Sequence, residues 1–327
     1  MINKESVDKL GYIDEPIDSD INLVSEINRL KVEKNAVILA HYYQNPEIQD
    51  IANFVGDSLA LAVKAITLKS KLIVFAGVKF MAETIKILLP DAKIVLPDMN
   101  AGCSLADSCN YHDFKEFKNN HPDNLVVTYV NTNADIKTLS DICCTSSNAE
   151  KVIKSIPEEK TIIFAPDKNL GNYLKNKLKR DNMVVWDGFC HVHQRFSSKR
   201  LIEQKKQNPK AKIIAHPECQ KSILIMADFI GSTSQLIDFT RNDSSTSYLV
   251  ATEYGVIHQM KKYSPSKEFI PVPPDDSTCA CNVCSYMKMV SLKKLYLSLK
   301  YEYPVVELNQ DIIAKAKLPI ERMIAIK

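Results

Sequence analysis

Three cysteines, Cys103, Cys190 and Cys284, close three copies of a sequence unit of about 87 residues and lie 87 and 94 positions apart. Three thiolates from distant segments suit a [4Fe–4S] cluster, which takes four ligands and, with one missing, leaves an iron open to substrate. Such an iron can act as a Lewis acid that binds a hydroxyl or carboxylate and assists loss of water. The pattern therefore favours catalysis over electron transfer.

Two further sets of polar residues recur with the same period. An apolar strand in each copy ends in an imidazole or phenol, and a hydroxyl follows at a common offset, before a helical-looking run. The strand ends are His41, Tyr129 and His216, and the hydroxyls are Ser58, Ser146 and the Ser232-Thr233 pair. If each hydroxyl begins a helix, its backbone N–H groups would suit a carboxylate or phosphate. The three sets together predict a site for an anionic substrate.

Residues close to these landmarks supply candidates for proton transfer. Tyr43, His193 and Glu218 follow the strand ends or the second cysteine by two or three positions, and Tyr129 is itself a candidate. Asn131 lies two residues beyond Tyr129, on the same side of an extended strand, where it could orient a carboxylate. For each histidine alone a structural role is equally plausible, so the case depends on their shared position.

Each copy reads as strand, helix, strand, helix, strand, which predicts parallel sheets covered on both faces. The fold class is therefore α/β, with three pseudo-symmetric three-layer α/β/α domains around a central active site at the carboxyl ends of the strands. We place the domains at residues 21–106, 107–194 and 195–290. A C-terminal helical segment, 291–327, is expected to dock back on the core.

Composition agrees with a large globular chain. It has 327 residues, 45% hydrophobic and 25% charged, with a formal net charge of +3 from interspersed signs, which gives no support to nucleic-acid binding. No apolar run approaches the roughly 20 residues that span a bilayer. The N-terminus lacks the pattern of a secretory signal, so we expect a cytoplasmic protein.

The remaining cysteines have no matched positions. We expect Cys109, Cys143, Cys144 and Cys219 to be buried thiols. Two more, Cys279 and Cys281, stand close to Cys284, and this cluster is at most half a zinc site because no second pair stands at a suitable spacing. Cys281 is an alternative to Cys284 as the third ligand, and Cys279 and Cys281 could form a redox-active pair.

The ordered motifs resemble those of the quinolinate synthase family, over roughly residues 35 to 325. The segments that carry the resemblance are Ala-His41-Tyr-Tyr43-Gln-Asn-Pro, Val-Gly-Asp-Ser58-Leu, Tyr129-Val-Asn131, Cys-Cys-Thr-Ser146-Ser-Asn-Ala, Cys190-His-Val-His193, His216-Pro-Glu218-Cys, Gly-Ser232-Thr233 and Cys-Asn-Val-Cys284-Ser-Tyr-Met. Such a series is far more specific than any one of its members.

The resemblance implies an enzyme of NAD biosynthesis that condenses iminoaspartate with dihydroxyacetone phosphate, releasing phosphate and two waters to give quinolinate. It implies an oxygen-sensitive [4Fe–4S] cluster held by the three repeat cysteines, with one iron free. It also implies possible partners, namely an aspartate-oxidising enzyme and cluster-assembly proteins. By position, the substrate-binding set is His41, Ser58, Tyr129, Asn131, Ser146, His216, Ser232 and Thr233, and the acid–base candidates are Tyr43, His193 and Glu218.

Two points qualify this interpretation. The second repeat continues as Asn131-Thr-Asn133-Ala, where the family more often has Asn-Ser-Ser-Ala or Asn-Thr-Thr-Ala, but Asn131 itself is retained. Two rival functions also stay open: another cluster-dependent hydro-lyase of a small polycarboxylate, and a cluster carrier. A carrier would have little use for a cavity of His, Tyr, Ser and Asn side chains.

Overall fold

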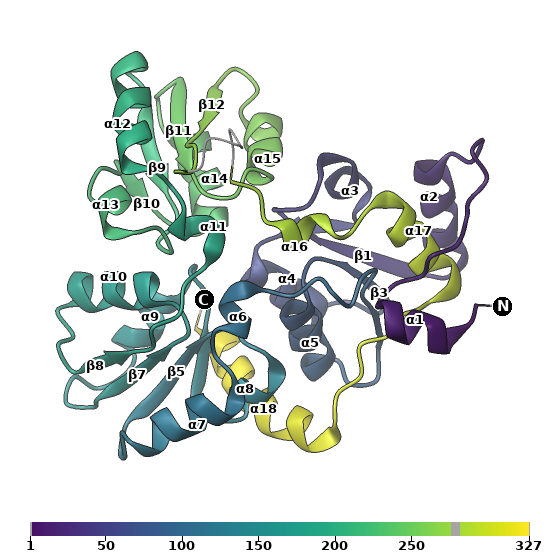
Figure 1. The fold of residues 1–327 in the computed structure, drawn as a ribbon, viewed down its shortest axis with the longest axis horizontal. Helices are drawn as coiled ribbons and strands as arrows, with labels where there is room; N and C mark the ends of the chain where they lie inside the picture. The colour runs from purple at the N-terminus through teal and green to yellow at the C-terminus, as the bar shows by residue number, and fades with distance from the viewer. Residues whose placement is uncertain (1, 276–281, 327) are drawn as a thin grey trace.

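Three parallel sheets of four strands each form three lobes, shown in Figure 1, in a computed structural model that describes residues 2–275 and 282–326. The strand orders are β2-β1-β3-β4, β6-β5-β7-β8 and β10-β9-β11-β12, so all three sheets have the same topology. Every strand pair within them is parallel. The expected α/β class with three-layer domains is confirmed.

The first sheet belongs to a segment that begins with two helices. Its elements are α1 (Lys4–Leu10), α2 (Leu23–Glu33), β1 (Ala36–His41), α3 (Pro46–Ile51), β2 (Phe54–Gly56), α4 (Ser58–Ala65), β3 (Leu72–Ala76), α5 (Lys79–Leu88), β4 (Lys93–Val95) and α6 (Ser104–Asp107). All five residues of β3 are buried, as a strand covered on both faces requires.

The second and third sheets repeat this order. The second segment has α7 (Tyr111–Asn119), β5 (Leu125–Tyr129), α8 (Ala134–Lys137), β6 (Ile142–Cys144), α9 (Ala149–Lys154), β7 (Ile162–Ala165), α10 (Lys168–Leu178), β8 (Met183–Val185) and α11 (His191–Gln194). The third has α12 (Ser198–Gln207), β9 (Lys212–Ala215), α13 (Lys221–Leu224), β10 (Phe229–Ile230), α14 (Thr233–Asn242), β11 (Ser247–Ala251), α15 (Val256–Tyr263), β12 (Glu268–Pro271) and α16 (Ser285–Lys288).

The expected order of three strands per copy is wrong by one strand. Each sheet has a further edge strand of two or three residues, β2, β6 or β10, directly before the hydroxyl-bearing segment. Runs this short carry neither a period of two nor a long apolar stretch, so pattern analysis passes over them.

The residue before each edge strand makes the same contact in all three repeats. In the first repeat, Oδ1 of Asn53 accepts the backbone N–H of Ile38 in the central strand at 2.9 Å, and the N–H of Asn53 donates to the carbonyl of Ile38. Asp141 and Asp228 hold their central strands in the same way, each at 2.8 Å. Asn53, Asp141 and Asp228 are 88 and 87 positions apart, so this paired hydrogen bond to the central strand recurs with the period of the repeat.

Two last helices, α17 (Leu292–Tyr301) and α18 (Gln310–Ala325), return to the first two lobes. Helix α17 packs on α2 and β3, and α18 packs against β6, α8 and α5 (Figure 1). The largest apolar cluster accordingly joins residues of the first two sheets, such as Leu39 and Phe164, with Met323 of α18. The domain boundaries themselves stay a prediction.

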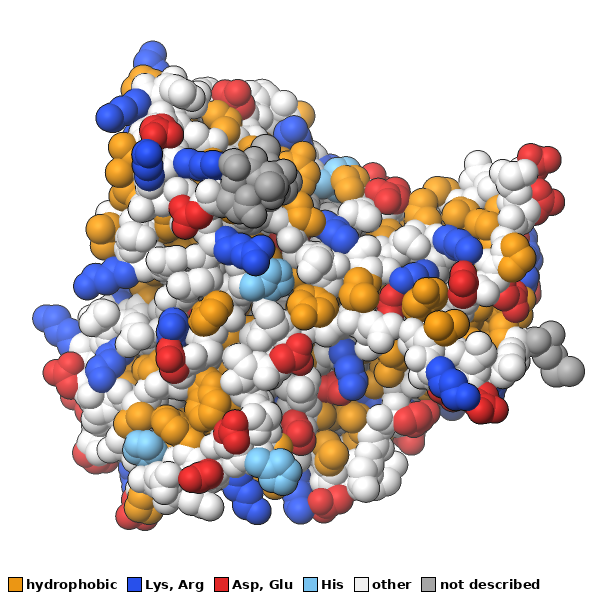
Figure 2. All heavy atoms as spheres, viewed as in Figure 1, with side chains coloured by type: hydrophobic (Ala, Val, Ile, Leu, Met, Phe, Trp, Pro, Cys, Tyr) orange, Lys and Arg blue, Asp and Glu red, His pale blue; other side chains and the backbone are white. Residues whose placement is uncertain are grey.

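The surface carries both signs of charge. Figure 2 shows Lys and Arg interspersed with Asp and Glu over the face viewed, without a field of one sign. Within the described part of the chain, no helix is long and apolar enough to cross a membrane.

Candidate active site

The three lobes meet at a cavity built from the carboxyl ends of their strands. The space between its atoms, with its opening to solvent, is about 670 Å³. Predicted site residues that line it are His41, Tyr43, Ser58, Cys103, Tyr129, Asn131, Ser146, Cys190, His193, His216, Glu218, Thr233 and Cys284. Fourteen site residues were predicted, and of these only Ser232 is not among the lining residues.

The three repeat cysteines occupy the same position relative to a short helix. Each is the N-cap residue of a four-residue helix, with Cys103 before α6, Cys190 before α11 and Cys284 before α16. Burial raises the pKa of the Cys103 thiol to about 12 and that of Cys284 to about 11, while nearby backbone N–H groups of these helices act in the opposite direction. Burial, and then Glu218 and the other two thiols, raise the pKa of Cys190. All three cysteines line the same cavity.

The other described cysteines differ from the repeat cysteines in their burial and position. Cys109, Cys143, Cys144 and Cys219 are buried and free, and none lines the cavity, so the expectation of buried thiols is confirmed. The proposed roles of Cys279 and Cys281, as an alternative ligand or a redox pair, lie outside the described residues.

Two of the three strand ends present a histidine in the same tautomer. The N–H of Tyr43 donates to Nδ1 of His41 at 3.1 Å, and the N–H of Glu218 donates to Nδ1 of His216 at 3.3 Å. Because Nδ1 accepts, the proton of each neutral ring is assigned to Nε2. Burial lowers the pKa of His41 to about 4 and of His216 to about 3. Both rings are therefore neutral N–H donors near pH 7, and Nε2 of His216 lies 3.1 Å from Oγ of Ser146.

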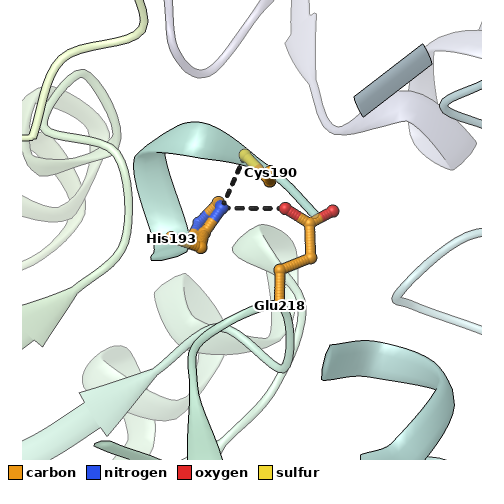
Figure 3. Close-up of side chains that lie close together, drawn as sticks. All are labelled: Cys190, His193 and Glu218. Carbon is orange, nitrogen blue, oxygen red and sulfur yellow. Dashed lines mark hydrogen bonds and ion pairs between the residues drawn. The ribbon is translucent and has the colours of Figure 1, made fainter. Parts of the chain in front are cut away.

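A buried pair, His193 and Glu218, lies beside the second cysteine. Figure 3 shows His193 pointing toward both Cys190 and Glu218, with its Nδ1 2.8 Å from Oε2 of Glu218 and 3.2 Å from Sγ of Cys190. Burial raises the pKa of Glu218, but His193, His216 and a hydrogen bond from Tyr129 outweigh it and bring the pKa to about 2. Glu218 is therefore ionised at neutral pH. Its other oxygen, Oε1, is buried and has no partner among the described residues.

A chain of hydroxyls extends this pair across the cavity. Oγ1 of Thr252 lies 3.1 Å from Nε2 of His193 and 3.0 Å from the Tyr43 hydroxyl, which in turn lies 3.0 Å from Oγ1 of Thr233. Since Nδ1 of His193 faces Glu218, Nε2 is the acceptor and the Thr252 hydroxyl donates to it. Burial, and then Glu218, raise the pKa of Tyr43 well above its usual value, so the phenol stays protonated.

The helix-start hydroxyls only partly follow expectation. Ser58 is the first residue of α4 and Thr233 is the first of α14, as predicted. Ser146 instead lies in a turn, because α9 begins three residues later at Ala149. The Ser232 hydroxyl caps α14 and accepts a hydrogen bond from Ser147 at 2.8 Å, and Ser232 is not among the residues that line the cavity.

Asn131 lines the cavity from a loop whose backbone is held by a buried lysine. Its Oδ1 is buried without a partner among the described residues. The fully buried Lys137 donates to the carbonyl of Val130 at 3.0 Å and to the carbonyl of Thr132, on either side of Asn131. The loop thus presents an amide whose oxygen is left for a ligand.

Sequence reasoning missed several lining or supporting residues. Asp57, Thr145, Ser104 and His191 line the cavity, and Oγ of Ser104 lies 2.7 Å from Nδ1 of His191. These two follow Cys103 and Cys190 directly, so the repeat itself could have revealed them. Thr252 has no hydroxyl at the corresponding positions of the other repeats, and its only signal is that it is a polar residue at the end of a buried strand.

Comparison with known proteins agrees with this geometry. Residues 25–325 match the quinolinate synthetase A protein family. The quinolinate synthase of Microcystis aeruginosa is 52% identical over 303 residues, which are 93% of this chain and 94% of that protein. Those of Chloroherpeton thalassium and Synechocystis sp. are 51% and 53% identical, covering 95% and 93% of this chain and 96% and 95% of their own lengths. The chain therefore belongs to the quinolinate synthase family of enzymes.

Proposed function

We propose that this protein condenses iminoaspartate with dihydroxyacetone phosphate to form quinolinate, with release of phosphate and two waters, in NAD biosynthesis. The observation that supports this most is the single cavity that receives one thiol, one strand-end ring and one hydroxyl-bearing segment from each of three domains. Two carboxylates and a phosphate on the substrates match this triple set of donors.

The donor set fits a [4Fe–4S] cluster. The three thiols that line the cavity come from three domains and are partly exposed, whereas the four other described cysteines are buried. Cys103, Cys190 and Cys284 would hold the cluster, and an iron without a protein ligand would supply a Lewis acid for the departing hydroxyls. The alternative metal set is Cys190, His193 and Glu218, whose ligand atoms lie within 4.8 Å of one another. That set would leave two of the three repeat cysteines without a role.

The substrate would be bound by neutral donors rather than by cations. The Nε2–H groups of His41 and His216 point away from their own backbone contacts, and the hydroxyls of Ser58, Ser146 and Thr233 line the same cavity. We propose that these groups, with the Tyr129 hydroxyl and the NH2 group of Asn131, bind the carboxylates and the phosphate. Ser232, retained from the predicted set, would act by capping the helix that Thr233 begins.

The acid–base groups are proposed to be Tyr43, Tyr129, His193 and Glu218. The ionised Glu218 holds the Nδ1 proton of His193 and accepts from Tyr129, so His193 presents its Nε2 lone pair toward Thr252 and Tyr43. A proton taken up at Nε2 would be stabilised by the adjacent carboxylate. Tyr129, whose pKa burial raises well above its usual value, is a proton donor at neutral pH.

The proposed partners are the two small substrates, an aspartate-oxidising enzyme as the source of iminoaspartate, and cluster-assembly proteins. The proposed compartment is the cytoplasm, since thiolate ligands of an oxygen-sensitive cluster need reducing surroundings.

The test is an assay under anaerobic conditions. Protein with measured iron and sulfide is given both substrates, and quinolinate and phosphate are quantified. Equal amounts of the two products support the proposal. Cluster-loaded protein that forms no quinolinate but dehydrates a small hydroxy-polycarboxylate would instead support the hydro-lyase alternative.

A further inference from the structure

Two buried carboxylates hold the backbone of two cavity cysteines. Oδ2 of Asp167 accepts the N–H of Cys190 at 3.2 Å, and its Oδ1 accepts the N–H of Leu170 at 2.7 Å. Asp167 is fully buried. It therefore links the start of α10 to the cysteine that precedes α11.

Glu253 does the same in the third domain. Its Oε1 accepts the N–H of Cys284 at 3.1 Å, and its Oε2 accepts the N–H of Gly255 at 2.6 Å. It is also fully buried, and Nζ of Lys288 lies 3.5 Å from Oε1 and donates to the carbonyl of Tyr43. Glu253 and Lys288 together tie the third cysteine to the first domain.

The two carboxylates occupy the same place in their repeats. Asp167 and Glu253 each lie two residues beyond the last alanine of the third strand, and the first domain has Val78 there. The backbone of the three cysteines differs accordingly. Cys190 and Cys284 have φ of −77° and −76°, whereas Cys103 has φ of −154°. The two cysteines held by a carboxylate thus share a conformation that the third does not adopt.

A carboxylate is the side chain that these contacts require. Both oxygens of Asp167 and both of Glu253 accept a backbone N–H. An amide has one acceptor oxygen and would turn its NH2 group toward the second N–H, which is a repulsive contact. A buried backbone N–H that loses its acceptor lowers the stability of the fold, because no water can replace the lost partner.

We propose that Asp167 and Glu253 are positioning residues that fix Cys190 and Cys284 for metal ligation, by holding the backbone N–H of each cysteine. Only the identity of the bound group, an iron–sulfur cluster, rests on the proposed function. Partners that orient metal ligands typically contribute about 10- to 100-fold to metal affinity.

The test uses Asp167→Asn and Glu253→Gln, which keep side-chain volume. The matched controls are Asp141→Asn and Asp228→Asn in the same two domains. Each control carboxylate accepts one backbone N–H of a central strand, and Asn53 makes the equivalent contact in the first domain, so an amide suffices there. Controls and test variants thus undergo the same chemical change at buried or half-buried sites.

Two measurements are made on each variant. After anaerobic reconstitution, we expect a chelator to remove iron about 10 to 100 times faster from the test variants than from the controls. In iron-free protein, we expect faster amide hydrogen exchange confined to the contacts of each carboxylate, namely residues 170 and 190–194 in Asp167→Asn and residues 255 and 284–288 in Glu253→Gln. The second measurement needs no cluster, so it tests the positioning role even if the wild type binds no iron, which would refute the proposed function instead.

Two results would overturn the inference. One is iron release and local exchange equal to those of the controls. The other is faster exchange throughout the second or third domain, including β5 or β9, because a general loss of stability would show a structural role without specific positioning.

Discussion

Replacing Thr252 by valine should break the hydroxyl chain between His193 and Tyr43. Valine matches threonine in shape but has no hydroxyl, so Nε2 of His193 loses the partner at 3.1 Å, while the Tyr43 hydroxyl keeps Thr233 at 3.0 Å. Thr252 and His193 are 2% and 1% exposed, so water does not replace the lost contact. One buried acceptor without a partner costs about 1 to 3 kcal/mol.

The loss should appear in both stability and catalysis. In a chain of this size each kcal/mol lowers the melting temperature by roughly 2 °C, so we expect a fall of about 2 to 6 °C by calorimetry. We also expect kcat for quinolinate formation to fall at least ~10-fold, since a well-placed general base contributes about 100-fold or more. Iron content should not change, because Thr252 is not among the thiols proposed to hold the cluster.

Thr240→Val is the matched control. Its hydroxyl is fully buried and donates to the carbonyl of Ile237 at 2.8 Å within α14, away from the cavity. The control variant also loses one buried threonine hydroxyl, but it leaves no ring nitrogen without a partner. Equal melting temperatures and equal kcat in the two variants would refute the proton-transfer chain.

Three further predictions follow from the same contacts. Tyr129→Phe removes the donor to Glu218 and should impair quinolinate formation while sparing iron content; full activity would count against a functional Tyr129. Lys137→Met frees the loop on both sides of Asn131 and should raise KM several-fold with little change in kcat, and an unchanged KM would contradict this. His41 and His216 have pKa values lowered to about 4 and 3, so the unfolded chain binds protons below about pH 6.5 that the folded protein does not. Stability of iron-free protein measured by urea unfolding should therefore fall from pH 6.5 toward pH 5, by at most about 1.4 kcal/mol per pH unit for each imidazole, and a rise would refute buried neutral rings.

The repeat explains why much of the site is predictable from sequence. Parallel strands place their carboxyl ends at one edge, so residues at matched strand ends and strand exits must converge when three equal sheets meet. His41, Tyr129 and His216 were found in this way, as were the three cysteines, and all six line one cavity.

Residues that break the repeat are the ones the sequence does not reveal. Asp167 and Glu253 correspond to Val78, and Thr252 has no hydroxyl counterpart, so a search for matched residue types passes over them. Their roles depend on which backbone groups a buried oxygen meets, and only the packing of the domains decides that. Ser146 was predicted from the repeat and lines the cavity, but the predicted helix start is wrong, because Ser146 lies in a turn.

The most direct test of the account compares quinolinate formation by anaerobically purified wild type, Cys103→Ser and Cys109→Ser. Cys103 lines the cavity with the other two repeat cysteines, whereas Cys109 is buried outside it. We predict full product and iron content for wild type and Cys109→Ser, and loss of both for Cys103→Ser. Wild-type rates and full iron content in Cys103→Ser, or no quinolinate from cluster-loaded wild type, would contradict the central claim.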